Sequence, residues 1–366
     1  MKNLDKKIIP ISFFLMFLFI SGCSNSSESN DKKNFGKIGV FFINGKRVYS
    51  PYSDNRKEPF PTERKTTVNG QAEITYLIPP KKDGPNIVLV PGFGLSSSIY
   101  LTTPDERDGW AQTFYEKGYP IYVMTPPDRA GSIRVDMVNA CLKDSKKYDC
   151  DSFYAQLGYT SLENPWQTWG FGPKFGETFS DSKFPAIPLK ENYIEQFGAS
   201  FVVYQGPSNL TMTEAEAMNK TSEEAIKALL EKVGPSVLVL HSASGTAGYK
   251  VAEENPSLVK AIVAIETTEC PSNNKEGNSP LGNIPFLGIW GDHIYERGEE
   301  GNHPARLKSC KEMVKAIKKE GKVPAELISL PESLEIYGNS HIMMQDSNNK
   351  EIANIISSWL KRNNIN

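Results

Sequence analysis

Strands made almost entirely of apolar residues alternate with amphipathic helices over most of this sequence, and no other feature restricts the fold as strongly. The expected strands cover residues 86–90, 121–124, 237–240, 259–265, 285–290 and 326–330. Two expected helices cover 110–117 and 221–233, and a third follows Gly245. Two more are indicated by apolar sets at helical spacing: Leu307, Cys310, Val314 and Ile317, and then Ile352, Ile355, Ile356, Trp359 and Leu360. Such strands are typical of a parallel sheet that helices cover on both faces. The sequence therefore predicts an α/β fold with a mostly parallel central sheet.

The ends of two elements carry additional signals. Two β-rich stretches, 38–48 and 71–78, come before the alternation, and the first contains the turn signal Asn44-Gly45. Thr221 and Glu224 predict a capping box at the start of the helix 221–233.

The alternation stops at about residues 128–212, a stretch rich in Trp, Phe, Tyr, Gly and Pro. A structureless loop of that length would be exceptional in a compact domain, so we expect a cap or lid inserted into the fold. Its aromatic residues either cover an apolar pocket or pack a small core of the insert itself: Trp166, Trp169, Phe171, Phe175 and Phe184.

Ser242 is the expected nucleophile, because it follows the apolar strand 237–240 and precedes small residues that open a helix. A serine on a sharp strand-to-helix turn presents its hydroxyl at the end of the sheet. The usual G-x-S-x-G pattern is altered here, since Leu240 and Ser244 stand where the glycines belong. Ser244 is the nucleophile in the competing register.

The general base is expected to be His341, which lies in a Gly-Asn-Ser loop after the last strand and before the final helix. His293 is the alternative base. His241 lies on the strand beside Ser242, so its side chain is expected to point to the other side of the chain.

Two carboxylates compete for the role of orienting the base. Asp292 comes directly after the apolar strand 285–290 and Gly291. Glu266 ends the apolar strand 259–265, where an ionised side chain needs a partner. The oxyanion would be bound by the backbone N–H of Ala243 and by that of Phe93, unless the glycine turn around Phe93 only reverses the chain.

Several blocks together resemble the α/β-hydrolase superfamily, and more narrowly secreted bacterial esterases with a His-Ser-x-Ser-Gly elbow. The blocks are 241–245, 103–110, Phe114, 118–123 and 338–341, and the resemblance covers most of 86–359. Pro127-Asp128-Arg129-Ala130-Gly131 departs from the glycine-richer turn of these esterases, which leaves the shape of the pocket wall open. The resemblance implies an α/β-hydrolase fold and favours Glu266 over Asp292 as the acid.

The N-terminus has the form of an export signal, with Lys2, Lys6 and Lys7 before a short apolar run at 8–20. The run ends in Ile20-Ser21-Gly22-Cys23, which resembles the lipobox of bacterial lipoproteins and implies that Cys23 is lipidated. We therefore expect a signal peptide at 1–22, a flexible tether at 23–34 and one domain at 35–366. The protein would be anchored in the cell envelope through its lipid, on the outer membrane where a cell has two.

Four cysteines remain after Cys23, and in an exported protein they are expected to form disulfides. The local pairs Cys141–Cys150 and Cys270–Cys310 are favoured among three pairings, and free buried thiols are the alternative.

The composition excludes some functional classes. With 41 Lys and Arg against 43 Asp and Glu, the net charge of −2 gives no field that favours nucleic acid. No metal motif, phosphate loop or dinucleotide fingerprint is present, so no cofactor or metal is expected. We predict a serine hydrolase for small carboxylic esters with an apolar group. Thioesters, lactones and peptides are the alternative substrates. The alternative function is that of a non-catalytic binding lipoprotein. The sequence also allows a homodimer.

Overall fold

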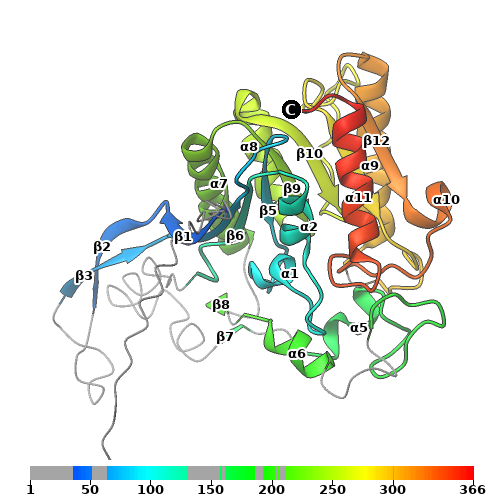
Figure 1. Ribbon diagram of the computed structural model, residues 1–366, viewed down its shortest axis with the longest axis horizontal. Coiled ribbons are helices and arrows are strands. Elements are labelled where there is room, and N and C mark those ends of the chain that lie inside the picture. Colours follow the sequence, from blue (N-terminus) through cyan, green and yellow to red (C-terminus); the bar gives the residue numbers. More distant parts are fainter. Residues whose placement is uncertain are drawn as a thin grey trace, which may run out of the picture. The chain divides into compact units, whose positions relative to one another are not determined.

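The computed structural model describes residues 36–51, 64–130, 157–158, 161–185, 193–202, 204–205, 212–299 and 301–366 (Figure 1). An eight-stranded sheet forms the centre of this part of the chain, in the order β1-β4-β6-β5-β9-β10-β11-β12. Its strands are β1 (Lys37–Ile43), β4 (Ala72–Ile78), β5 (Asn86–Val90), β6 (Ile121–Thr125), β9 (Ser236–His241), β10 (Val259–Ile265), β11 (Phe286–Trp290) and β12 (Ala325–Ser329). Within this sheet, only the β1–β4 and β4–β6 pairs are antiparallel. The predicted mostly parallel sheet is confirmed.

Helices cover both faces of the sheet, as predicted (Figure 1). Successive strand residues point to opposite faces, so Val237 and Val239 of β9 join one buried cluster while Leu238 and Leu240 join the other. The first cluster includes residues of α2 (Trp110–Glu116) and α11 (Asn349–Arg362). The second includes residues of α7 (Met212–Val233), α8 (Ser244–Glu254) and α9 (His303–Glu320). The short helices are α1 (Ser98–Leu101), α10 (Leu330–Leu334) and the 3-10 helix η1 (Pro256–Leu258).

One sequence prediction about element ends is wrong and another is confirmed. Helix α7 begins at Met212, so Thr221 lies inside it and forms no capping box. The added turns, MTEAEAMNK, are rich in good helix formers, which continue the helix without an apolar stripe. The predicted turn at Asn44-Gly45 is confirmed, because the β-rich stretch 38–48 breaks at Asn44, whose φ of 60° is left-handed. The chain after the break, β2 (Lys46–Pro51), pairs with β3 (Arg64–Asn69) in a separate two-stranded sheet.

Part of the inserted stretch is described, as α5 (Asn164–Thr168), α6 (Tyr193–Ala199) and the two-residue strands β7 (Leu157–Gly158) and β8 (Tyr204–Gln205). Phe171 stacks on Phe184 with ring centroids 3.7 Å apart, and both are buried with Trp166. These three aromatic residues belong to the same buried cluster as Val237 and Val239 of β9. Phe175 is exposed and Trp169 is half-buried.

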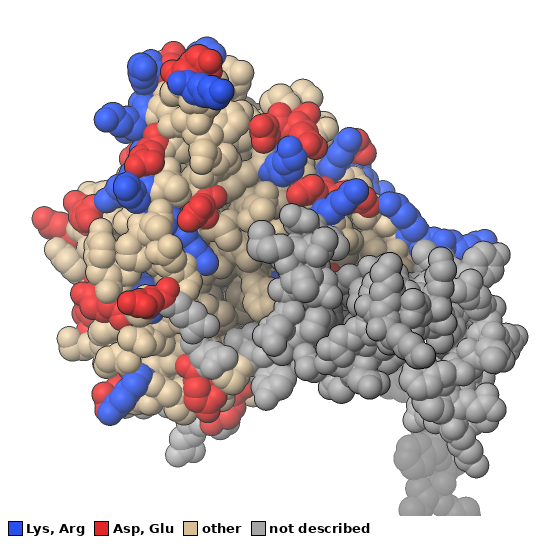
Figure 2. Space-filling model, turned by 180° about the vertical axis from the view of Figure 1, so that it is seen from behind, with Lys and Arg blue, Asp and Glu red and all other residues tan. Residues whose placement is uncertain are grey.

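Acidic and basic side chains are interspersed over the described surface seen in Figure 2, as the charge balance predicts. No helix within the described ranges combines the length and hydrophobicity that a membrane span requires. The predicted signal peptide, tether and Cys23 lie outside the described residues.

Candidate active site

The ends of β9 and β10 place Ser242 and Glu266 at one edge of the sheet, because these strands are parallel neighbours. Each residue leaves its strand in the left-handed region, with φ of 52° at Ser242 and 39° at Glu266. This conformation costs a non-glycine residue about 1–3 kcal/mol, and such strain is concentrated at functional sites. Ser242 thus lies on a sharp turn between β9 and α8.

The two serines considered as nucleophile have different surroundings. Ser244 Oγ accepts a hydrogen bond from the backbone N–H of His241 at 2.9 Å and lies 3.0 Å from the carbonyl oxygen of Val90. No hydrogen bond engages the Ser242 hydroxyl in the described part of the chain. Ser244 therefore supports the backbone of the turn, whereas the Ser242 hydroxyl is available to react.

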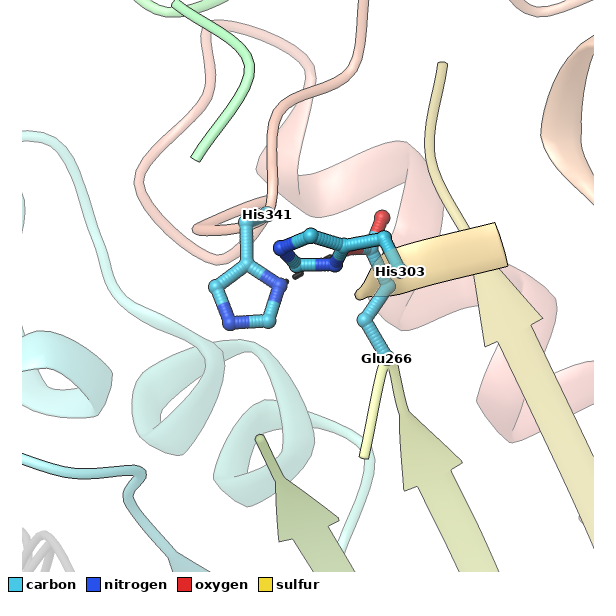
Figure 3. Close-up of side chains that lie close together, drawn as sticks. All are labelled: Glu266, His303 and His341. Carbon is cyan, nitrogen blue, oxygen red and sulfur yellow. Dashed lines mark hydrogen bonds and ion pairs between the residues drawn. The ribbon is translucent and has the colours of Figure 1, made fainter. Parts of the chain in front are cut away.

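Glu266 and His341 are in direct contact (Figure 3). Oε2 of Glu266 lies 2.7 Å from Nδ1 of His341, and both side chains are buried. An ionised carboxylate only accepts hydrogen bonds, so Nδ1 carries the proton and Nε2 is left as an acceptor. Figure 3 shows the second ring nitrogen of His341 pointing away from Glu266. This is the tautomer and orientation that a general base requires.

Arg297 is a buried partner of Glu266 that the sequence analysis missed. Its Nη1 lies 2.5 Å from Oε2 of Glu266, and its Nη2 lies 2.5 Å from the carbonyl oxygen of Asp292. The backbone N–H of Gly291 donates to Oε1 of Glu266 at 2.7 Å. A carboxylate ending an apolar strand signals that a partner exists, but nothing in the sequence identifies Arg297. Burial lowers the pKa of His341, and the charge of Arg297 lowers it further.

His303 lies beside His341, near the same carboxylate. Its Nδ1 is 3.8 Å from Oε2 of Glu266, and its ring meets the ring of His341 edge-on at 5.1 Å (Figure 3). Among the described residues, neither nitrogen of this buried ring has a hydrogen-bond partner. Burial lowers the pKa of His303 to about 3, so the ring is neutral near pH 7.

Asp292 and His293, the alternative acid and base, lie apart from this pair. The carboxylate of Asp292 accepts the backbone N–H groups of His293 at 2.7 Å and Gly338 at 2.9 Å. Nε2 of His293 lies 2.9 Å from the carboxylate of Asp181. Asp292 therefore holds the backbone near His341 without contacting its ring.

The loop that follows β5 lies against Ser242. A Cβ atom on Gly92 would stand 2.7 Å from Cβ of Ser242, so this position admits no side chain. Arg129 donates a hydrogen bond to the carbonyl oxygen of Gly92. Ala243 is the N-cap residue of α8. Both predicted oxyanion donors thus lie next to Ser242: Ala243 follows it in sequence, and Phe93 follows Gly92, which packs against it.

The inserted segment contacts the site through Trp169. Its carbonyl oxygen accepts the backbone N–H of His341 at 2.8 Å, and its ring centroid lies 6.2 Å from that of His341. The ring of Phe201 lies 5.7 Å from Trp169, and Phe201 forms a β-bridge with Leu95. Trp169 and Phe201 are half-buried and Phe93 is exposed, so apolar surface borders the site.

A disulfide joins Cys270 to Cys310 with their Cα atoms 4.9 Å apart. Cys270 lies four residues after Glu266, and Cys310 lies on α9. The bond ties the loop after Glu266 to that helix. The other predicted pair, Cys141–Cys150, lies outside the described residues.

Two groups of described side chains bring together atoms that could hold a metal: Glu266, His303 and His341, and Asp181, Asp292 and His293. In the first group, Arg297 already places a positive charge on the carboxylate and would repel a second cation. In the second group, backbone N–H groups occupy Asp292. Neither group is assigned as a metal site.

No family model matches the chain. The sequence is 23% identical over 329 residues to a probable secreted lipase of Fungal sp. (strain ATCC 74256), across 75% of this chain and 81% of that protein. Among solved structures, a novel bacterial esterase matches with a TM-score of 0.73 and 30% sequence identity, across 89% of this chain and 96% of that chain. The match to the esterase takes in most of both chains.

Proposed function

This chain belongs to the α/β-hydrolase superfamily, and from that premise we propose that it is a serine esterase that forms an acyl-enzyme on Ser242. The observation that carries the proposal is the 2.7 Å contact between Glu266 and His341 at the sheet edge where Ser242 leaves its strand. The relatives support the ester substrate, since one is a bacterial esterase and the other a probable secreted lipase.

In the first half of the reaction, Nε2 of His341 takes the proton of the Ser242 hydroxyl as Oγ bonds to the carbonyl carbon. The electron pair of the carbonyl moves onto its oxygen, which the N–H groups of Phe93 and Ala243 bind. When the carbonyl re-forms, the alkoxide leaves and takes the proton from His341. Water then repeats the same steps on the acyl-enzyme, which releases the acid and restores Ser242.

Glu266 keeps Nδ1 of His341 protonated and stabilises the imidazolium that forms in each half-reaction. The Arg297 guanidinium pairs with the buried carboxylate and balances its negative charge.

The apolar surfaces of Phe93, Trp169 and Phe201 favour an ester with an apolar acyl or alcohol group. Thioesters, lactones and peptides would pass through the same intermediate, and a substrate panel separates them.

The proposed location is the cell envelope, with Cys23 as the lipid anchor after removal of residues 1–22. Metabolic labelling with a palmitate analogue should mark the wild-type protein and leave Cys23→Ser unmarked. An unlabelled wild-type protein would contradict the anchor and would leave the esterase proposal untouched.

The test of the reaction compares Ser242→Ala with Ser244→Ala. Wild type should label with a fluorophosphonate and hydrolyse short p-nitrophenyl esters, and Ser242→Ala should do neither. Ser244→Ala should still label, because its hydroxyl only bonds backbone atoms. Unchanged labelling of Ser242→Ala would contradict the assignment, and no turnover on a broad ester panel would favour the binding lipoprotein.

The acid is tested with Glu266→Gln and Asp292→Asn. Replacing a triad carboxylate by its amide typically lowers kcat about 10⁴-fold. We expect a loss of that order for Glu266→Gln and a much smaller one for Asp292→Asn. The reverse order would assign Asp292.

A further inference from the structure

His241 links three parts of the proposed active site that are far apart in sequence. It is the last residue of β9, and its side chain is fully buried. Nδ1 accepts the backbone N–H of Gly92 at 3.2 Å. Nε2 lies 3.0 Å from the backbone carbonyl oxygen of His341. The peptide bond of His241 leads directly to Ser242.

The two backbone partners fix the state of this imidazole. A backbone N–H can only donate and a carbonyl oxygen can only accept, so Nδ1 is unprotonated and Nε2 carries the proton. Both nitrogens are then satisfied in the neutral ring, and a proton on Nδ1 would break the bond from Gly92. Burial lowers the pKa of His241, and the neighbouring His341 lowers it further. The ring is thus a neutral bridge with a defined donor end and a defined acceptor end.

At the acceptor end, His241 holds the loop that would bind the oxyanion. The next peptide group, between Gly92 and Phe93, is held by Arg129, which donates to the carbonyl oxygens of Gly92 and Leu95. In a trans peptide, a carbonyl and the next N–H point in opposite directions. The bond from Arg129 therefore directs the N–H of Phe93 away from the guanidinium.

At the donor end, His241 holds the base. The backbone of His341 is bonded on both sides, through its N–H to the carbonyl oxygen of Trp169 and through its carbonyl oxygen to His241. The first bond comes from the inserted segment and the second from the nucleophile strand. His241 thus sets the distance between the base and the strand that carries Ser242.

We propose that His241 is a positioning residue that sets the mutual placement of Ser242, the Phe93 N–H and His341. The inference rests on the proposed function, because it concerns the same reaction. The sequence analysis expected only that the His241 side chain would point to the other side of the chain; in the structure its ring bonds the oxyanion loop and the base, and its centroid lies 4.7 Å from that of His341. Sub-ångström placement matters in such a site, since a 1 Å displacement can cost about 10²-fold in rate.

Three substitutions separate the two bonds. In His241→Asn the amide lies near the place of Nδ1 and can still accept from Gly92, while in His241→Gln it extends to the place of Nε2 and can still donate to His341. His241→Leu loses both bonds. We expect kcat to fall about 10²-fold in the leucine variant and less in the two amide variants, with KM nearly unchanged. Affinity for a trifluoromethyl ketone should fall most in the variants that lose the Gly92 bond, because its adduct places an oxyanion in the hole.

A merely structural role predicts a different result. Ile356→Ala on α11 creates a buried defect away from the site and serves as the control for lost stability. A His241→Leu variant that keeps the wild-type kcat per folded molecule, or loses activity only as Ile356→Ala does, would overturn the proposal. A wild-type enzyme that lacks esterase activity would contradict the proposed function instead.

If His241→Leu does not fold, nuclear magnetic resonance of the wild-type protein still tests the bridge. Long-range ¹H–¹⁵N correlations should find His241 as the neutral Nε2–H tautomer from about pH 5 to 9. The Nδ1–H tautomer, or a ring that takes a proton in this range, would overturn the assignment.

Discussion

Arg297 places Nη1 2.5 Å from Oε2 of Glu266, the same oxygen that accepts the hydrogen bond from Nδ1 of His341. One buried carboxylate oxygen therefore contacts both a permanent cation, Arg297, and the proposed base, His341. Sharing the carboxylate weakens its hold on a protonated His341, because Arg297 neutralises part of the charge that attracts the proton.

Arg297→Met should move the acid limb of the pH profile. Arg297 lowers the pKa of His341 in addition to the larger effect of burial. Its removal should raise that pKa, so the acid limb of kcat/KM should shift to higher pH. The unpaired Glu266 should also cost about 3–5 kcal/mol of stability, measured by urea unfolding. Arg297→Lys keeps a charge and should shift the limb less; a limb that stays in place in Arg297→Met would contradict this electrostatic coupling.

His303→Leu should stabilise the protein in acid relative to wild type. The pKa of folded His303 is lowered to about 3, whereas the unfolded value is near 6.5. The stability that depends on the neutral ring is present above about pH 6.5 and is lost as the pH falls toward 3. At pH 5 the unfolded chain gains about 2 kcal/mol by binding this proton. The stability difference between His303→Leu and wild type should therefore grow by about that amount between pH 8 and pH 5, while Met313→Leu on the same helix should show no such change.

Ser242→Gly should be more stable than Ser242→Ala. Both remove the hydroxyl, but only glycine adopts a φ of 52° without a steric penalty. The left-handed conformation costs a residue with a Cβ about 1–2 kcal/mol, so the glycine variant should unfold at a correspondingly higher urea concentration. The two variants should be equally inactive. Equal stability would mean that the turn at Ser242 is unstrained.

The fold was largely predictable because its central parallel strands are buried and read as continuous apolar runs, as in β5 and β9. Where the hydrophobic pattern ends, prediction failed. The first turns of α7 carry no apolar stripe, and the recognised turn at Asn44 did not indicate that β2 pairs in a separate sheet.

The candidate site could be inferred from the sequence only for residues whose position along the chain indicates a chemical role. Ser242 and Glu266 end neighbouring strands, and His341 lies in the loop before the last helix. Arg297 and the bridging role of His241 depend on contacts between segments far apart in sequence. A buried carboxylate requires a partner, but the sequence does not say which of the 41 basic residues supplies it.

Removing the disulfide with Cys270→Ala and Cys310→Ala should destabilise the protein. The bond closes a loop with a sequence separation of 40, for which the chain-entropy model gives about 4 kcal/mol. Because Cys270 lies four residues after Glu266, loss of the disulfide should also lower kcat at temperatures where the double variant is still folded. Thermal unfolding with and without a reductant measures the first effect, and the reductant should change the wild type more than the double variant, which keeps the predicted Cys141–Cys150 pair.

Trp169→Ala should change which esters are preferred. Its half-buried ring lies 6.2 Å from His341, so it can contact the apolar part of a bound ester, while its bond to the His341 N–H comes from the backbone and survives the substitution. We expect kcat/KM for p-nitrophenyl octanoate to fall about tenfold more than for the acetate, because each buried methylene contributes about 1–3 kcal/mol in a hydrophobic pocket. Phe175→Ala removes an exposed ring of the same insert that packs on Trp166, and it should affect both esters equally. If Trp169→Ala also lowers both activities by the same factor, the ring supports the base without contacting the substrate, and the apolar group of the ester binds elsewhere.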